Sequence, residues 1–350
     1  MTEARPGARV AAEWTIVALG AVVALYFGRD VLIPVAVAVL IWFLIGALAG
    51  AAARGLRLRR PPVLLKIAVA ILFLAAVIAL GRVLGANLVR IGGEFDLDRS
   101  PLIGRVMAAA ASFGLPAEFD LRSLAAFWPL PDLVGAAASV LRDLVSDASL
   151  VFLYVLFLMI DERYFDAKMR AVFPDPVRRR RARVRLRRIA AEARIYLWLM
   201  FQLSFGVGLA TFAASALFGL EGAAFWGVLA FVLNFIPTIG SILAVVAPAA
   251  FALLVFEDPL ALLGLLGVLA ATQFVAGELV MPRLMANSLN LSAVVILLAL
   301  VAWGALWGPV GMFLGIPVTV IAMRVFADFP QGRVVAAMLS KDGRLPGRRR

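Results

Sequence analysis

The sequence predicts an all-α, polytopic integral membrane protein with about eight membrane segments, some of them Gly/Pro-broken or re-entrant hairpins. Of its 350 residues, 63% are hydrophobic and 16% charged, and the mean hydropathy is +0.99. Soluble domains are about 45–50% apolar and about 25% charged, so this composition is not theirs. The apolar residues also form long runs, and roughly 20 helical residues cross a hydrocarbon core of about 30 Å.

Residue types that are missing narrow the chemistry. The chain contains no Cys and no His, which removes disulfides, thiolate and imidazole metal sites and Ser-His-Asp triads. It also has no GxxxxGK[ST] phosphate-binding loop. We therefore expect no enzyme activity, no cofactor and no metal site. Transport driven by a gradient or by passive release fits the composition better.

Basic residues cluster in a few segments and assign the sides of the membrane. The net charge is +12, and 12 of the 34 Lys and Arg residues lie within residues 161–194. Other groups follow the second apolar run and occupy the C-terminal tail. Basic loops stay in the cytoplasm, so these segments predict cytoplasmic sides, with anionic lipids as partners and no nucleic acid.

Residues 1–90 are expected to form three N-terminal membrane spans: Trp14–Phe27, Val31–Ala53 and Val63–Leu88. A polar break at Arg29 and Asp30 separates the first two. The third starts after a proline pair, which suits a first helical turn because the missing N–H would be unpaired there anyway.

The middle of the chain is more polar. Residues 91–148 hold four Arg against eight acidic residues, with many turn signals, and predict a small helical extracytoplasmic insertion. Residues 149–194 predict a returning helix plus a basic cytoplasmic segment. Within it, 177–194 either lies along the membrane surface or leads directly into the next span. Residues 329–350 predict a basic cytoplasmic tail.

Residues 195–328 are expected to form a C-terminal membrane core with two broken hairpins. Short apolar arms flank Asn234–Ser241 and again flank Trp303–Pro309, with a full-length helix at Leu260–Val280 between them. Non-helical backbone at membrane depth is tolerated only where protein or a wet cavity satisfies it. Paired interrupted segments therefore point to a transport pathway. The candidate pathway residues are Asn234, Pro237, Thr238, Gly240, Ser241, Gln273, Glu278, Asn287 and Asn290.

Each candidate has a structural alternative. The polar residues near Pro237 could bind a small solute or cation, or could only cap the broken helices. Glu278, helped by Gln273, could be a coupling-ion or proton site, or could pair with Arg283 at the membrane edge. A third group is expected to serve hairpin packing rather than ligand contact: Gly304, Gly308, Gly311, Gly315 and Pro317.

These pieces together resemble the AI-2E family of transporters, the autoinducer-2 exporter family. The resemblance is carried by the following segments: Asn-Phe-Ile-Pro-Thr-Ile-Gly-Ser at 234–241, Pro282, Leu-Asn-Leu-Ser at 289–292, Trp303–Gly311 and Ile316-Pro317. They match in order and spacing over roughly residues 190–328, and the N-terminal half matches in layout. The resemblance implies about eight membrane segments and allows a homo-oligomer. Many relatives carry a His or similar polar residue where this chain has Asn290 and Ser292, which puts a proton role there in doubt.

Three functional hypotheses follow. The first is a secondary transporter or exporter of a small polar solute, which the resemblance suggests is a quorum-sensing furanone like autoinducer-2. The second is a sodium (cation)/proton antiporter with Glu278 as the titrating group. The third is a non-transporting membrane scaffold. For all three we expect a multi-pass protein of the bacterial inner membrane with both termini in the cytoplasm.

Overall fold

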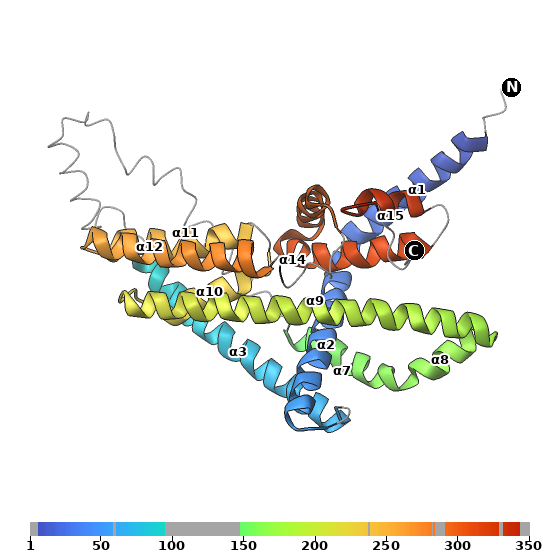
Figure 1. The fold of residues 1–350 in the computed structure, drawn as a ribbon, viewed down its shortest axis with the longest axis horizontal. Helices are drawn as coiled ribbons and strands as arrows, with labels where there is room; N and C mark the ends of the chain where they lie inside the picture. The colour runs from blue at the N-terminus through green and yellow to red at the C-terminus, as the bar shows by residue number, and fades with distance from the viewer. Residues whose placement is uncertain are drawn as a thin grey trace. The chain divides into compact units, whose positions relative to one another are not determined.

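The computed structural model describes residues 6–58, 61–94, 148–236, 239–281, 283, 291–328 and 332–343, and in these ranges the chain is helical. The extended structure found there is a single isolated bridge between Leu291 and Ser340. The helical elements, drawn in Figure 1, are the following: α1 (Pro6–Phe27), α2 (Arg29–Gly55), α3 (Val63–Glu94), α7 (Ala148–Asp161), η2 (Glu162–Tyr164), α8 (Phe165–Val172), α9 (Pro176–Leu217), α10 (Ala223–Leu233), α11 (Ile239–Val255), α12 (Pro259–Phe274), η3 (Val275–Val280), α14 (Ala293–Asp328) and α15 (Arg333–Leu339).

Five helical stretches in the described ranges are long and apolar enough to cross a membrane: Arg29–Gly55, Val63–Val83, Pro176–Leu217, Pro259–Val280 and Ala293–Ala327. Three shorter apolar helices accompany them, at Thr15–Phe27, Ala223–Leu233 and Ile239–Val255. The prediction of an all-α polytopic membrane protein is confirmed. The extracytoplasmic insertion predicted for residues 91–148 lies almost wholly outside the described residues and stays a prediction.

The chain forms two compact units. One comprises residues 1–42, 150–189 and 290–350, and the other comprises 43–149 and 190–289. The first unit holds α1, α7, α8, α14 and α15. The second holds α3, α10, α11, α12 and η3, together with the apolar part of α9.

The junction between α1 and α2 differs from the polar break expected at Arg29 and Asp30. Gly28 N–H donates to the Ala24 carbonyl at 2.9 Å, and Leu32 N–H donates to the Gly28 carbonyl at 2.9 Å. Gly28 therefore ends the hydrogen bonding of α1 and begins that of α2. Arg29 is already a residue of α2. The number of crossings within residues 1–90 stays a prediction.

A basic arm is formed by α8 and the first half of α9, residues 165–189. Asp175 caps α9, because its side chain accepts from the N–H groups of Val177 at 3.1 Å and Arg178 at 3.2 Å. The guanidinium of Arg183 on α9 pairs with Asp166 on α8 at 2.9 Å. Of the two alternatives for residues 177–194, the structure shows the second, since this segment continues without interruption into the apolar part of α9 (Figure 1).

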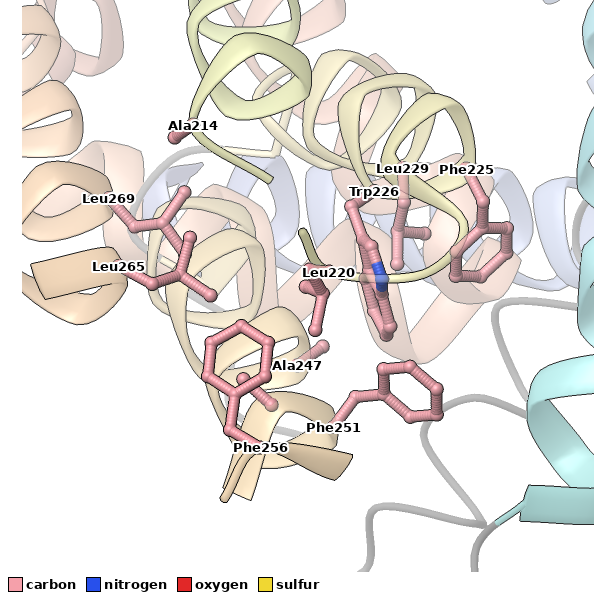
Figure 2. Packing of buried hydrophobic residues seen from close by; sticks show 11 residues of the cluster. Ala214, Leu220, Phe225, Trp226, Leu229, Ala247, Phe251, Phe256, Leu265 and Leu269 are labelled. Carbon is pink, nitrogen blue, oxygen red and sulfur yellow. The ribbon is translucent and has the colours of Figure 1, made fainter. Parts of the chain in front are cut away.

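The second unit packs around a core of large apolar side chains. Trp226 and Phe225 of α10 meet Phe251 of α11, and Leu265 and Leu269 of α12 close the same cluster (Figure 2). The rings of Trp226 and Phe251 are 5.5 Å apart. Because Phe251, Leu265 and the two α10 aromatics are at most 1% exposed, this core fixes α10, α11 and α12 against one another.

The last long helix, α14, is a hairpin of two arms. Trp307 and Gly308 leave helical geometry, with φ/ψ of −128°/15° and 63°/−150°. Trp303 Nε1 donates to Thr319 Oγ1 at 3.1 Å, although 16 residues of straight helix would separate them by about 24 Å. The chain therefore reverses within Trp307–Gly308, inside the segment where the sequence predicts a break.

Candidate functional site

A buried polar pair lies where α10 ends. Asn234 Nδ2 donates to Ser204 Oγ on α9 at 3.0 Å. Asn234 is 8% exposed and Ser204 is fully enclosed. An amide and a hydroxyl in an otherwise apolar interior are costly to bury unless they are hydrogen-bonded, so this bond fixes the end of α10 against α9.

After Asn234, the end of α10 and the start of α11 lie in close contact. Ile236 N–H donates to the Leu233 carbonyl at 2.8 Å, and α11 begins at Ile239. Gly240, in the first turn of α11, is buried, and a Cβ placed on it would collide with the Leu233 backbone carbonyl. A glycine is required at this position because no side chain fits between the two helix ends.

Two glycines let α9 and α10 cross at backbone contact. A Cβ on Gly208 would lie 2.8 Å from the Gly227 carbonyl oxygen, and a Cβ on Gly227 would lie 2.8 Å from the Gly208 carbonyl oxygen. Ser204 precedes Gly208 by one helical turn. The close crossing therefore brings Ser204 within hydrogen-bonding reach of Asn234 on α10.

Four helices meet beside the polar pair. Val207 of α9, Ala230 of α10, Ala244 of α11 and Ala276 of η3 form one buried cluster. Val207 lies one turn from Ser204, and Ala230 lies one turn from Asn234. The helix that carries Gln273 and Glu278 therefore packs into the same convergence through Ala276.

Gln273 is the most unusual polar group on this helix. Both of its amide atoms are enclosed, and neither has a hydrogen-bond partner among the described residues. An unpaired amide in an apolar interior costs about 1–3 kcal/mol. Such a group is available to a polar ligand or to water.

The helix changes its winding directly after Gln273. Residues Val275–Val280 form a π-helical turn that contains Glu278. Such turns occur frequently at functional sites, because the wider winding changes which backbone carbonyls are paired. Glu278 is exposed, and no ion pair joins it to Arg283 in the described chain. The structure thus does not show the salt bridge considered as an alternative.

Of the remaining pathway candidates, the structure describes Ser241. Ser241, half-buried, lies one residue after Gly240 in α11. Four others lie outside the described residues, and their roles stay predictions: Pro237, Thr238, Asn287 and Asn290. In the part of the chain that the structure describes, no group of three acidic side chains is arranged to hold a metal ion.

The residues expected to serve packing lie in the α14 hairpin. A Cβ on Gly311 would collide with the Trp303 carbonyl, and one on Gly315 would lie 3.2 Å from the Trp303 ring. Gly304 faces only the flexible Met312 side chain, while Gly308 has a φ of +63° at the reversal. Pro317 is buried in the second arm. Gly311 and Gly315 therefore let the two arms approach closely, and none of the five residues carries a polar side chain.

Sequence reasoning missed the polar face of α9. Ser204, Thr211 and Ser215 are each at most 1% exposed, and the Ser215 hydroxyl has no hydrogen-bond partner in the described chain. With Gly208 they follow one another at intervals of four, three and four residues, which is one helix face. Gly304, Gly308, Gly311 and Gly315 of α14 have the same spacing, and this pattern in α9 is the sequence signal that identifies Ser204.

The site thus contains polar side chains that can bond a ligand in place of one another, and its helices are held at close spacing by glycines. The amide of Asn234, the amide of Gln273 and the hydroxyl of Ser204 can donate to or accept from a small polar molecule. In the described chain no donor bonds the Asn234 Oδ1 atom. This chemistry suits reversible binding by hydrogen bonds.

Curated proteins with similar sequences are transport proteins. The chain is 36% identical over 200 residues to "AI-2 transport protein TqsA" of Escherichia coli (strain K12), a match covering 57% of each chain. It is 32% identical over 219 residues to "Putative transport protein YhhT" of the same strain, covering 61% of this chain and 59% of the relative. The chain therefore matches a little over half the length of each of these relatives.

These relatives correct the argument about enzymes. The expectation of no enzyme activity was drawn from missing residue types and motifs, and such absences cannot assign a protein to a class. What the comparisons give instead is similarity to proteins named as transport proteins. The negative statement is thus replaced by a positive one: the chain is similar to proteins named as transport proteins.

The family assignment covers nearly the whole chain. The sequence model described as AI-2E family transporter matches residues 15–331. The match includes the N-terminal helices as well as both hairpins, whereas the motif resemblance covered roughly residues 190–328. The chain belongs to the AI-2E family of transporters.

Proposed function

We propose that this transporter carries a small polar solute and that Asn234, Ser204 and Gln273 contribute to its pathway. The observation that supports this most is the buried hydrogen bond of 3.0 Å between Asn234 and Ser204 beside a broken hairpin. The fully unpaired amide of Gln273 lies one helical turn from Ala276, which packs into the same convergence. A solute could replace the Asn234–Ser204 bond by equivalent bonds of its own, so that binding remains reversible.

For the substrate we propose a quorum-sensing furanone of the autoinducer-2 type, moved outward as an export substrate. The support is the name of a relative that is 36% identical and is called an AI-2 transport protein. A furanone-derived polyol carries several hydroxyl groups, which match amide and hydroxyl side chains better than charged ones. The family match favours transport over the scaffold hypothesis.

We also propose the membrane location and the orientation of the protein. The protein would lie in a bacterial inner membrane with both termini and the basic arm in the cytoplasm, because the basic residues cluster there. Anionic lipids and a homo-oligomeric assembly are further proposals. So are the domain ranges 1–90, 91–148, 149–194, 195–328 and 329–350.

Efflux of the furanone signal from proteoliposomes tests this proposal. Asn234→Leu removes the amide at similar volume, and Ser204→Ala removes the hydroxyl. We expect efflux by each variant to be about tenfold slower than by the wild type, which corresponds to one lost hydrogen bond of about 1.4 kcal/mol. Gly206→Ala is the matched control on α9, because a Cβ there meets nothing within 4 Å. Size-exclusion profiles would show that all variants are folded. Wild-type efflux by a folded Asn234→Leu variant would contradict the proposed pathway.

A second candidate function is sodium (cation)/proton antiport at Glu278. The observation that favours it is the π-helical turn Val275–Val280, which places an exposed carboxylate beside rewound backbone carbonyls. We expect Glu278→Gln to abolish collapse of an imposed sodium or proton gradient while leaving membrane insertion intact. Furanone efflux that is insensitive to this change would support the first function, and gradient collapse that Glu278→Gln leaves unchanged would exclude Glu278 as the titrating group.

A further inference from the structure

Arg194 is held in an unusual way where the basic part of α9 meets its apolar part. Its guanidinium carbon lies 5.9 Å from the centre of the Phe43 ring on α2, in a cation–π contact. Its Nε atom is enclosed and has no hydrogen-bond partner in the described chain. The side chain is therefore fixed by packing and not by an acidic residue.

The outer end of the same guanidinium remains available. Its Nη atoms are not among the enclosed polar atoms, and no hydrogen bond or ion pair links them to another described residue. Glu192, two residues away, is about 200° around the helix from Arg194. In the described chain the guanidinium thus has no acidic partner, and its Nη groups can donate hydrogen bonds to a ligand.

The surface of α2 beside Arg194 is open. A Cβ on Gly46 would have Arg194 Nε as its one close neighbour, at 3.7 Å, and a Cβ on Gly50, one turn further along, would meet nothing within 4 Å. These two glycines therefore leave this face of α2 uncovered by side chains beside Arg194. Phe43 and Arg194 belong to the same compact unit, which keeps their arrangement fixed.

The position along α9 distinguishes Arg194 from the other arginines. Ile195, the next residue, begins the apolar run, so we expect Arg194 at the level of the lipid headgroups. Arg188, the nearest preceding arginine, lies six residues earlier on the same continuous helix, a rise of about 9 Å, which is close to the screening length of about 8 Å at physiological salt. Arg178 and Arg183 are already paired with acidic residues of the arm.

We propose that Arg194, stacked on Phe43 beside Gly46, is a binding site for a phosphate group, carried by an anionic phospholipid of the cytoplasmic leaflet or by a free phosphate solute. A planar guanidinium binds phosphate through two parallel hydrogen bonds, and stacking on an aromatic ring preorganises it for this geometry. Basic sites between membrane helices at this level are suited to phospholipid headgroups. The site is independent of the furanone pathway.

Binding of a spin-labelled phosphatidylglycerol to the full-length protein in phosphatidylcholine nanodiscs tests this site. We expect Arg194→Gln to weaken binding about tenfold, through loss of one bidentate charge-assisted contact. Arg194→Lys, which keeps the charge but not the planar fork, should recover only part of it. Arg188→Gln, an exposed arginine of the arm, is the matched control and should bind like wild type.

Thermal unfolding in the same nanodiscs distinguishes the two sources of phosphate. The site binds lipid if phosphatidylglycerol raises the unfolding midpoint of the wild-type protein, millimolar inorganic phosphate does not, and Arg194→Gln shows no rise. The reverse pattern assigns it to a free phosphate. Equal lipid binding by Arg194→Gln and Arg188→Gln, or no response to either phosphate source in wild type, would overturn the proposal.

Discussion

The two broken hairpins of this transporter both contain irregular backbone within apolar helices, but they stabilise it with different side chains. In the hairpin of α10 and α11, the break is preceded by a buried amide that bonds a hydroxyl of a third helix, Asn234 to Ser204 at 3.0 Å. In the α14 hairpin, the reversal takes only Trp307 and Gly308. Both hairpins keep irregular backbone inside an apolar environment, yet only the first keeps exchangeable polar side chains there.

The polar groups of the α14 hairpin are used within the structure. Trp303 Nε1 donates to Thr319 across the two arms at 3.1 Å. Trp307 Nε1 donates at 2.9 Å to the Leu25 carbonyl, which in an unbroken helix would accept from Arg29. These donors bond acceptors across the hairpin reversal and at the helix junction, so we interpret this hairpin as structural. The proposed solute pathway lies at the α10–α11 hairpin.

The largest expected effect concerns the glycine that each hairpin needs for its backbone approach. Gly240→Ala and Gly311→Ala each force a Cβ into a backbone carbonyl, of Leu233 and Trp303 respectively. Backbone cannot move aside as a side chain can, so we expect a loss of about 3 kcal/mol or more and little folded protein. Fluorescence size-exclusion chromatography measures this. Gly277→Ala, where a Cβ meets nothing within 4 Å, is the control.

This pair of variants also tests whether the hairpins are equally constrained. Similar losses for Gly240→Ala and Gly311→Ala would show that the difference between the hairpins lies in their side chains. A well-folded Gly240→Ala protein would instead show that the α10–α11 break can adjust, which would favour a moving element there.

A smaller effect is expected at the crossing of α9 and α10. Gly227→Ala places a Cβ 2.7 Å from Phe212 Cβ and 2.8 Å from the Gly208 carbonyl oxygen. The two helices must separate slightly, at a cost of about 1–3 kcal/mol. Because the crossing positions Ser204 near Asn234, we expect solute efflux per folded molecule to fall together with the unfolding midpoint.

The comparison with Gly206→Ala makes this test specific. Gly206 lies on α9 with open space around it, so that variant should retain both efflux and stability. If Gly227→Ala lowers stability but leaves efflux per folded molecule unchanged, the spacing of α9 and α10 does not govern the pathway.

Much of this architecture could be predicted from the sequence, because long apolar runs and Gly/Pro breaks report directly on membrane helices. The reversal at Trp307–Gly308 lies within the predicted break at Trp303–Pro309. The junction at Gly28 was not predictable from its neighbours, since the charged pair Arg29–Asp30 suggested a turn while the backbone resumes helical bonding there.

The candidate site was predictable only in part. Asn234 was predictable because it begins the segment that contains Pro237 and Gly240, whereas Ser204 lies 30 residues earlier in the chain. The partnership depends on the crossing of two helices, which a single sequence does not reveal. The π-helical turn around Glu278 was also hidden, because its residues, Val275–Val280, carry no distinctive pattern.

The third effect is expected within the α14 hairpin. Thr319→Val removes the hydroxyl that accepts from Trp303 Nε1, leaving a donor that is only partly buried. One neutral hydrogen bond contributes about 1 kcal/mol. We therefore expect a small fall in the midpoint of thermal unfolding and unchanged efflux. A large loss of efflux in a folded Thr319→Val protein would contradict the structural interpretation of this hairpin.

The smallest effect is expected for Gly304→Ala, in the first arm of the same hairpin. A Cβ there would lie 2.8 Å from Met312 Cε and 3.0 Å from Met312 Cγ, and a methionine side chain can rotate away because its bonds are flexible. The gain in helix propensity over glycine is about 1 kcal/mol and opposes the cost of moving Met312. The unfolding midpoint should therefore stay within the equivalent of about 0.5 kcal/mol of wild type. A loss of stability as large as that of Gly311→Ala would mean that the Met312 side chain is fixed by its surroundings and cannot move away from a Cβ at position 304.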